Sequence, residues 1–473
     1  MTAFIARKIL KCSNELIRIR LSQRLVMQKL FGTDGIRGKA DEYPLDAETV
    51  QRIGAAAAKY FLDRLGRPPK FIYGRDTRES GPEIEAAFHA GAALTGATGE
   101  SAGVFTTPGV AFLTRKFDFD AGVVISASHN PYHDNGIKIF LPSGQKLEEA
   151  AERLIEAEVF REGSVEKAKS VQLDSLRAAE FRSAYLGHLS ENFRDLDLLK
   201  MKIVADCANG AACGFADSLF GSYGAEVVVI NDRPDGRNIN ENCGSLHLEN
   251  LRDAVKREHA DFGVAFDGDA DRALFIDENG EVVDGDATLW ILAKDLKCRG
   301  ELASGKVVAT VMSNIGLEAV LRDADIELIR TAVGDKHVLE ELLRSGSELG
   351  GEQSGHIILP KASLVGDGMM TALFMLNAIR NNATSFSETR AGFRKYPQRL
   401  VNIRVKEKKP FDAVLAIVEA AEKVERELSS EGRLLLRYSG TENLARVMVE
   451  GKDQTEVDAL ANSLADVIRE QLG

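Results

Sequence analysis

The sequence predicts an α/β fold: three related α/β domains followed by a smaller C-terminal α+β domain. Short apolar segments alternate with helical ones, which is typical of a mostly parallel sheet covered by helices. The alternation restarts twice, with a period of about 100 residues, which indicates repeated units of one design. A length of 473 residues is enough for three or four domains.

The first α/β domain is expected over residues 27–180. An Ala-rich segment at 46–65 predicts a helix, and the Gly-Arg-Pro-Pro that follows it is a clear stop signal. The remaining segments alternate in the same way: strand Lys70–Tyr73, helix 81–95, extended Gly103–Phe105, helix 108–116 and strand Ala121–Ile125.

The second and third domains are expected over 181–283 and 284–394. In the second the order is strand Lys202–Ala205, helix 210–222, strand Glu226–Ile230, helix 247–258 and strand Phe262–Phe266. In the third it is helix 286–298, strand 306–310, helix 315–323, strand 326–330 and helix 335–345.

The pattern changes over residues 395–473, where strands with one exposed face precede and follow long helices. We expect strand Leu400–Val405, helix 411–428, strands Leu434–Arg437 and Ala445–Val449, and helix 454–472. At the other end, residues 1–26 contain six basic residues against one acid. We interpret them as an extension outside the fold, with an organelle-targeting or surface-binding role as the alternative.

Composition excludes several classes of protein. Hydrophobic residues make up 44% and charged residues 28%, which is ordinary for a globular chain and excludes disordered and collagen-like classes. No apolar run approaches the roughly 20 residues that cross a bilayer. A formal net charge of −12 argues against a nucleic-acid-binding protein. Five cysteines without a Cys-x-x-Cys pair fit a reducing cytoplasm better than a disulfide framework or a zinc site.

A polar loop follows the strand that ends at Ile125. It reads Ser-Ala-Ser-His-Asn-Pro over 126–131 and continues to Asp-Asn-Gly-Ile-Lys at 134–138. Ligands of open α/β sheets bind at the carboxyl ends of strands, so a serine here is a candidate nucleophile once its hydroxyl is activated. The alternative is a helix N-cap, because Ser and Asn before Pro cap helices well. Adjacent side chains often point apart, so a pair with His129 is not assumed.

A second loop places Asp267, Asp269 and Asp271 at alternate positions after a buried strand. Three carboxylates in one turn converge on a hard cation such as Mg²⁺, Mn²⁺ or Ca²⁺. An EF-hand is the alternative, but Arg272 replaces the glycine that its sixth position needs, and the flanks read as strands. We therefore reject the EF-hand.

Two further loops have the composition of ligand-binding segments. Residues 350–356 read Gly-Gly-Glu-Gln-Ser-Gly-His, which suits recognition of sugar hydroxyls but equally describes a plain tight turn. Residues 437–442 read Arg-Tyr-Ser-Gly-Thr-Glu, with Arg446 beyond them. Backbone N–H groups, hydroxyls and guanidiniums together make a phosphate clamp, whereas the alternative is a β-hairpin turn with exposed arginines.

Taken together, the four loops resemble the α-D-phosphohexomutase superfamily from about Met27 to the end of the chain. The serine, metal, sugar and phosphate loops follow one another in the family's order, and residues 31–38 and 74–81 match as well. Within the superfamily, Gln353 and the Ser-Gly-Thr-Glu at 439–442 make the chain similar to the bacterial glucosamine-specific branch. The extension before Met27 is a departure from the family pattern.

The resemblance implies four domains in a heart-shaped arrangement around a central cleft. It implies an isomerase that interconverts glucosamine 6-phosphate and glucosamine 1-phosphate, through a phosphoserine enzyme and a 1,6-bisphosphate intermediate that also serves as activator. The product would feed UDP-N-acetylglucosamine synthesis and the cell wall. A cytoplasmic location is implied, with no nucleic-acid or membrane partner, and a homodimer is left open.

The resemblance also implies roles for individual residues. Ser128 would carry the phosphoryl group, and a phosphoserine oxygen would join Asp267, Asp269 and Asp271 around one Mg²⁺ per subunit. Glu352 and Ser354 would bind sugar hydroxyls. The phosphate that is not reacting would be held by Arg437, Ser439, Gly440, Thr441 and Arg446.

The group that takes the proton of the attacking hydroxyl is left open between Lys138 and His356, with Arg37 supplying positive charge. Lys138 would need a depressed pKa to act as a base, which nearby cations can provide. Arg272 either orients the metal loop or the phosphoserine, or makes a structural ion pair.

Two other functions are considered. The same chemistry on mannose or glucose phosphates is the nearest alternative, because Gln353 discriminates only weakly between the branches. A noncatalytic sugar-phosphate sensor, or a cation-binding structural protein, belongs to a different class. Loss of Ser128 or of a metal carboxylate would have favoured the sensor, and all four residues are present.

Overall fold

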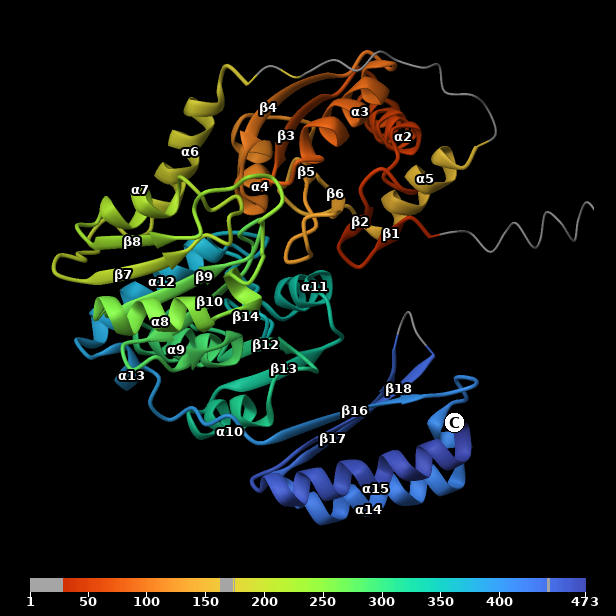
Figure 1. Ribbon diagram of the computed structural model, residues 1–473, viewed down its shortest axis with the longest axis vertical. Coiled ribbons are helices and arrows are strands. Elements are labelled where there is room, and N and C mark those ends of the chain that lie inside the picture. Colours follow the sequence, from red (N-terminus) through yellow and green to blue (C-terminus); the bar gives the residue numbers. More distant parts are fainter. Residues whose placement is uncertain (1–28, 162–172, 174, 440–442) are drawn as a thin grey trace, which may run out of the picture.

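The computed structural model describes residues 29–161, 173, 175–439 and 443–473. The basic extension at 1–26 lies outside these residues. The described chain forms four separate sheets, of six, five, four and three strands, one after another along the sequence. Figure 1 shows three α/β units packed side by side and a C-terminal unit set below them. The predicted fold class of three α/β units and a smaller α+β unit is confirmed.

The first sheet has the strand order β1-β2-β6-β5-β3-β4. Helix α2 starts where the Asp46 carboxylate accepts the Thr49 N–H and ends at Gly66, whose φ of 66° closes the helix as the stop signal predicted. The elements of this unit are β1 (Phe31–Gly32), β2 (Gly35–Lys39), α2 (Ala47–Leu65), β3 (Lys70–Arg75), α3 (Gly81–Ala93), β4 (Thr98–Val104), α4 (Thr107–Lys116), β5 (Ala121–Ile125), β6 (Asp134–Phe140) and α5 (Glu149–Val159).

The second sheet has the order β11-β10-β9-β7-β8. Its elements are α6 (Ala178–Ser190), β7 (Lys202–Asp206), α7 (Ala216–Gly221), β8 (Glu226–Ile230), α8 (Glu249–Glu258), β9 (Phe262–Phe266), β10 (Ala273–Asp277) and β11 (Val282–Val283). The predicted helix at 210–222 is wrong in its first half. Residues before 216 form a turn instead, with Gly214 at a φ of 77° and the Ala211 N–H donating to Gly268 O.

The third sheet has the order β13-β12-β14-β15. Its elements are α9 (Gly285–Cys298), β12 (Lys306–Thr310), α10 (Ile315–Asp323), β13 (Glu327–Thr331), α11 (Asp335–Ser345), β14 (Gly350–Gly351), β15 (Ile357–Ile358), α12 (Gly368–Asn382) and α13 (Phe386–Thr389). The sequence analysis did not predict α12, whose buried face is rich in Met and Leu.

The three α/β sheets share one arrangement. In each, three parallel strands lie side by side, and the third is followed by an antiparallel strand: β4-β3-β5 with β6, β8-β7-β9 with β10, and β13-β12-β14 with β15. The expectation of mostly parallel sheets therefore holds only for the central strands. This repetition confirms the repeated design that the 100-residue period indicated.

The C-terminal unit is an antiparallel sheet of order β16-β18-β17, with two helices on one face. Its elements are β16 (Gln398–Arg404), α14 (Leu415–Leu428), β17 (Arg433–Tyr438), β18 (Leu444–Glu450) and α15 (Gln454–Leu472). In Figure 1 its sheet faces the other units and its helices lie on the far side. The junction is at Glu450, a fully buried carboxylate that accepts from Arg433 at 2.9 Å and from Asn314 of the third unit at 3.2 Å.

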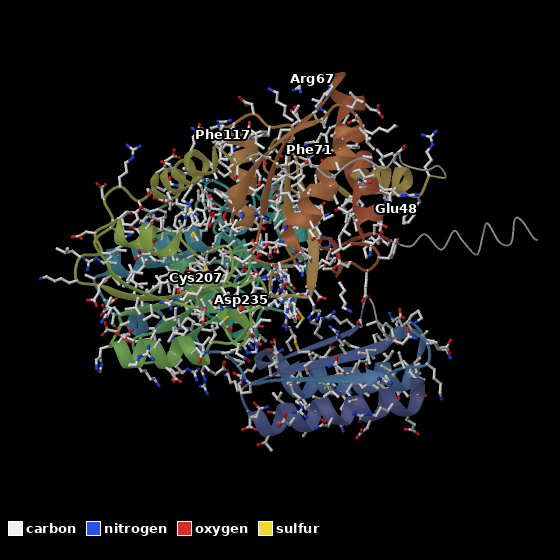
Figure 2. All side chains as sticks on the ribbon, turned by 45° about the horizontal axis from the view of Figure 1, so that its top comes forward. Glu48, Arg67, Phe71, Phe117, Cys207 and Asp235 are labelled. Atoms are coloured by element: carbon white, nitrogen blue, oxygen red, sulfur yellow. The ribbon has the colours of Figure 1, made fainter. Side chains whose placement is uncertain are left out.

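The hydrophobic core explains how rigidly these units hold together. One continuous core joins the three α/β units, running from Phe105 through Phe215 to Trp290. The other face of the first sheet has its own core around Phe71, which is fully buried (Figure 2). The C-terminal unit has a separate core that includes Val447 and Leu464. The first three units thus form one rigid support for loops that meet between them.

Helices α2 and α3 approach so closely that only glycine fits between them. A Cβ at Gly54 would lie 2.0 Å from Phe88 O, and one at Gly91 would lie 1.9 Å from Gln51 O. We expect Gly54→Ala to lower the unfolding temperature, at a cost of about 3 kcal/mol, because backbone atoms must move apart.

The matched control is Gly187→Ala on α6, where an added Cβ meets nothing within 4 Å. It should stabilise the protein by about 0.5–1 kcal/mol, because alanine loses less backbone entropy in a helix. Thermal unfolding of the two variants and of the wild type tests both the expected loss and the expected gain in stability. A Gly54→Ala protein as stable as the wild type would contradict the close packing.

No helix within the described residues is both long and apolar enough to cross a membrane.

Candidate active site

The serine, metal and sugar loops occupy the same topological position in their three units. Each connects the third parallel strand to the antiparallel strand: residues 126–133 join β5 to β6, 267–272 join β9 to β10, and 352–356 join β14 to β15. All three therefore start at the carboxyl end of a parallel strand, where ligands of α/β sheets bind. Because the three units share one fold, the candidate nucleophile, the metal ligands and the sugar-binding residues lie close together.

Ser128 is buried at the tip of the first loop, in a left-handed conformation with a φ of 53°. Its Oγ donates to Asp267 Oδ2 at 2.5 Å and lies 3.3 Å from His129 Nδ1. Its N–H donates to Ser126 Oγ at 2.9 Å. The loop leads into strand β6, so the alternative of a helix N-cap is wrong. The hydroxyl instead points directly at the carboxylate loop.

The backbone of Ser128 is fixed by side chains from two units. Its carbonyl oxygen accepts from Asn240 Nδ2 at 3.0 Å and from Nη2 of the buried Arg78 at 3.3 Å. Gly268 packs against the same oxygen, since a Cβ there would lie 2.5 Å from it. Sequence reasoning missed Arg78 and Asn240 as positioning residues, although Arg78 lies in one of the matching stretches.

Asp267, Asp269 and Asp271 form the group of potential metal ligands. One oxygen of each lies within 4.8 Å of the others, and all three residues are buried. Oδ1 of Asp269 and Oδ1 of Asp271 have no hydrogen-bond partner. Buried carboxylate oxygens without a donor, converging in one place, fit a hard divalent cation such as Mg²⁺. The flanking elements β9 and β10 are strands, in agreement with the rejection of an EF-hand.

The three carboxylates differ in how far neighbouring cations balance their negative charge. Burial, together with the neighbouring Asp271 and Asp269, raises the pKa of Asp267 well above its usual range. Burial has the same tendency at Asp271, but there Lys138 and His356 outweigh it and hold its pKa well below the usual range. Asp267 is thus the carboxylate whose charge most lacks a partner.

Lys138 projects from β6 into the carboxylate loop. Its Nζ lies 2.8 Å from Asp269 Oδ2, and 3.2 Å from both Asp271 Oδ2 and Asp34 Oδ2. Burial alone would lower the pKa of Lys138, but these three carboxylates raise it well above the usual range. The depressed pKa that Lys138 would need to act as a base is therefore not found in this arrangement, because carboxylates surround the ammonium.

The two histidines of the site differ. Burial, Arg272 and Arg37 lower the pKa of His129 to about 4, so a neutral imidazole stands beside the Ser128 hydroxyl. His356 is buried, with Nδ1 3.6 Å from Asp271 Oδ1, and its Nε2 accepts the Gly366 N–H at 3.1 Å. Burial opposes protonation there, but Asp271 and Asp335 raise the pKa of His356. Sequence reasoning did not anticipate the contact between Ser128 and His129.

Two arginines flank the serine loop. Arg37 donates to Ala127 O at 3.1 Å and is paired with Asp34. The Arg272 backbone N–H donates to Asp267 Oδ1 at 3.2 Å, while its guanidinium is 3.8 Å from Asp271. These contacts place one guanidinium against the first loop and one beside the second, and they leave both interpretations of Arg272 open.

The sugar loop presents a carboxylate and a hydroxyl. Glu352 Oε1 accepts the Gly334 N–H at 3.1 Å, and Ser354 Oγ donates to Glu352 Oε2 at 3.2 Å. Gly355 has a φ of 90°, and a Cβ there would lie 2.3 Å from Ala273 O of the second unit. The loop is thereby packed against the strand that leaves the metal loop, and it is more than a plain tight turn.

The phosphate loop lies at the end of the hairpin of β17 and β18. Arg437 and Arg446 are directly opposite each other across this hairpin, and Arg446 Nη2 is 3.5 Å from Ser439 Oγ. Burial and Arg446 lower the pKa of Arg437. Like charges facing each other across strands repel, which an anion between them would relieve. Gly440 and Thr441 lie outside the described residues.

The first three units enclose a cavity of about 570 Å³, whose lining includes Arg37, His129, Asp271, Arg272, Glu352 and His356. A larger groove of about 700 Å³ between α6 and α7 has a lining without carboxylates or histidines, so size alone does not locate the site. Within the described part of the chain, Arg437, Ser439 and Arg446 do not line the 570 Å³ cavity. In Figure 1 their unit is set below the other three.

Four family models match the chain in order. They are the phosphoglucomutase/phosphomannomutase alpha/beta/alpha domains I, II and III, at residues 28–166, 183–280 and 284–396, and the C-terminal domain at 400–467. A phosphoglucosamine mutase of Solibacter usitatus is 49% identical over 94% of this chain and 99% of its own length. The chain belongs to the phosphoglucosamine mutase family. It is thus an isomerase of the phosphohexomutase superfamily.

Other members of the family are nearly as similar. A phosphoglucosamine mutase of Deinococcus deserti is 47% identical over 93% of this chain and 98% of its own length. Among solved structures, a phosphoglucomutase/phosphomannomutase family protein of Burkholderia thailandensis has a TM-score of 0.75 at 23% identity, over 94% of this chain and 97% of its own. An Aspergillus fumigatus N-acetylphosphoglucosamine mutase, solved with GlcNAc-6P and magnesium, has a TM-score of 0.65 at 19% identity, over 93% and 95%. These structures share the fold.

Proposed function

We propose that this enzyme interconverts glucosamine 6-phosphate and glucosamine 1-phosphate, with Ser128 as the phosphoryl carrier. The observation that supports this most strongly is the placement of the Ser128 hydroxyl, buried and 2.5 Å from one carboxylate of a metal-binding trio. The names of the relatives, all phosphoglucosamine mutases at 44–49% identity, support the choice of sugar.

The reaction consists of two phosphoryl transfers in opposite directions. First, O1 of glucosamine 6-phosphate attacks the phosphorus of phosphorylated Ser128. The new O–P bond forms, the bond to Ser128 Oγ breaks, and the proton of the attacking hydroxyl ends on the leaving Ser128 oxygen. The resulting 1,6-bisphosphate turns over in the cavity, and its 6-phosphate is returned to Ser128 Oγ. One serine, one set of metal ligands and one phosphate clamp thus serve both ends of the sugar.

Phosphoryl transfer depends on positioning and on neutralising charge. A Mg²⁺ held by Asp267, Asp269, Asp271 and a phosphoserine oxygen would supply a positive charge to the transferred group. Lys138, whose Nζ contacts Asp269 and Asp271, adds a second positive charge at the metal loop. Arg37 and Arg272 add guanidiniums to the cavity wall.

The attacking hydroxyl needs an acceptor for its proton. Of the two groups proposed from the sequence, Lys138 is protonated in the arrangement described here, so it accepts a proton only after giving one up. His356 has both nitrogens engaged, by Gly366 and by Asp271. We therefore propose that Lys138 relays the proton, giving one to the leaving oxygen and then accepting one from the attacking hydroxyl, and that His356 supports Asp271.

The sugar loop and the phosphate loop hold the substrate in two orientations. Glu352 and Ser354 offer an acceptor and a donor to hydroxyls, which a flipped sugar can still meet. We assign the phosphate that is not reacting to Arg437, Ser439, Gly440, Thr441 and Arg446.

A hexose 1,6-bisphosphate serves as activator by phosphorylating Ser128. We place the enzyme in the cytoplasm, and its assembly into a homodimer is open to test.

A comparison of three substrates tests the proposal. With Mg²⁺ and a trace of hexose 1,6-bisphosphate, we expect kcat/KM for glucosamine 6-phosphate to exceed that for glucose 6-phosphate and mannose 6-phosphate by about 100-fold or more, as sites built around a polar group discriminate. A preference for glucose or mannose would keep the mechanism and overturn the choice of sugar. Inactivity on all three, with Ser128 phosphorylated, would overturn the proposed function.

A further inference from the structure

A buried lysine outside the predicted site links two of its parts. Lys146 follows β6 in the first unit and is close to fully buried, with 10% of its side chain exposed. Its Nζ contacts two carboxylates from different units: Asp34, in the turn between β1 and β2, and Asp335, the first residue of α11. None of the motifs in the sequence analysis included Lys146 or Asp335.

On one side, Lys146 is paired with Asp34, the carboxylate that also contacts Lys138 and Arg37. Asp34 also lies 3.2 Å from Lys138 Nζ and is paired with Arg37. Burial alone would raise the pKa of Asp34, but Lys138, Lys146 and Arg37 hold it well below its usual range. The position of Asp34 therefore affects two cationic side chains of the active site at once.

On the other side, Lys146 holds the start of α11, which supports the sugar loop. The residue before Asp335 is Gly334, whose N–H donates to Glu352 Oε1 at 3.1 Å. Asp335 Oδ2 is also 3.7 Å from His356 Nε2. A displacement of Asp335 would thus reach Glu352 and His356 through their direct neighbours.

We propose that Lys146 is a positioning residue, which sets the sugar loop of the third unit at a fixed distance from Lys138 and Arg37 of the first. The contacts form one chain: Glu352, the turn at Gly334–Asp335, Lys146, Asp34, and then Lys138 with Arg37. Lys146 lines the 570 Å³ cavity together with Asp34 and Asp335, but it contacts neither the metal ligands nor Ser128. It acts on the reaction by fixing the distance between the sugar hydroxyl and the phosphoryl group, as remote positioning residues do.

A second ion pair between the same two units provides the control. Lys336, the next residue of α11, pairs with Glu152 of α5, and Lys336 is the more exposed partner, at 25%. Both pairs line the groove of about 530 Å³ between these units. The Lys336–Glu152 pair joins the first and third units but contacts neither Asp34 nor Glu352. If Lys146 only fastened the two units together, the two lysines would be equivalent.

The test compares Lys146→Met with Lys336→Met under the assay conditions above. We expect Lys146→Met to lower kcat by about 100-fold with KM little changed, as loss of a supporting side chain does. Lys336→Met should keep the wild-type kcat. Asp335→Asn leaves Lys146 on Asp34, weakens the link to the third unit and removes the negative charge beside His356, so we expect a loss of about tenfold. Because Asn keeps the shape of Asp, this variant provides the test if Lys146→Met fails to fold.

Three outcomes would overturn the proposal: a wild-type kcat in Lys146→Met, an equal loss in Lys336→Met, or a loss confined to KM. The double variant Lys146→Met with Asp335→Asn should lose no more than Lys146→Met alone, and additive losses would also count against it. The inference rests on the proposed function, but the two fail differently. A wild-type protein inactive on glucosamine 6-phosphate contradicts the function, whereas an active one with an insensitive Lys146 contradicts only the inference.

Discussion

Replacing Ser128 with alanine should reduce turnover by about 10⁴-fold or more, because the variant lacks the hydroxyl that we propose carries the phosphoryl group. The Ser128 Oγ donates to Asp267 and lies 3.3 Å from His129 Nδ1, so its loss removes two hydrogen bonds that are local to the loop tip. The fold should be retained, with an unfolding temperature close to that of the wild type. The measurements are kcat on glucosamine 6-phosphate and the protein mass after incubation with glucose 1,6-bisphosphate.

Ser126 provides the matched control within the same loop. Its Oγ accepts the Ser128 N–H at 2.9 Å and its hydroxyl bonds to the buried Asp76 carboxylate, so it supports the loop through groups outside the metal-binding trio. Ser126→Ala should lower activity but still gain a phosphoryl group in the mass measurement, whereas Ser128→Ala should gain none. A phosphorylated Ser128→Ala protein with appreciable turnover would remove Ser128 from the mechanism.

The candidate site was predictable where its residues are close together in sequence. Asp267, Asp269 and Asp271 alternate in one turn, so their convergence is visible without a structure. Lys146 and Asp335 are far apart in the chain, and each alone has the character of an ordinary surface charge. Their meeting depends on how the first and third units pack, which no local pattern encodes.

Elements of the fold were likewise predictable where local sequence signals define them, and not where tertiary contacts do. The helix α2 carries its own start and stop signals, Asp46 and Gly66, and was predicted nearly to the residue. The antiparallel strands β6 and β15 were not predicted, because β6 overlaps the serine loop and β15 has only two residues. Residues 210–215 have helical composition, but they form a turn whose Ala211 N–H bonds to the metal loop. Tertiary contacts there override propensity, as is usual beside active sites.

The removal of one metal carboxylate should change activity and stability in opposite directions. In the metal-free protein, Asp267 is fully buried beside Asp269 and Asp271, and its pKa is raised well above the usual range. Asp267→Asn removes this repulsion and keeps the shape of the side chain. We expect it to raise the unfolding temperature in EDTA, while kcat with Mg²⁺ falls by about 100-fold or more.

The pH dependence of this stability difference follows from the direction of the shift. A carboxyl whose pKa is higher in the folded state binds more protons there than in the unfolded chain, so its cost to stability is absent at low pH and grows as pH rises. Asp267→Asn carries no such cost at any pH. Its advantage over the wild type in EDTA should therefore widen from about pH 5 to 8.

Added Mg²⁺ should reverse the order of the two proteins. A cation bound only by the folded state stabilises it, by about 2.7 kcal/mol when its concentration is a hundred times the dissociation constant. The wild type should gain this stability and the Asp267→Asn protein should gain little. Thermal unfolding with EDTA and with Mg²⁺, at several pH values, measures both effects. Equal stabilisation of both proteins by Mg²⁺ would contradict this prediction. The charge of Asp267 would then play no part in binding the cation, and the three aspartates would not form the metal site.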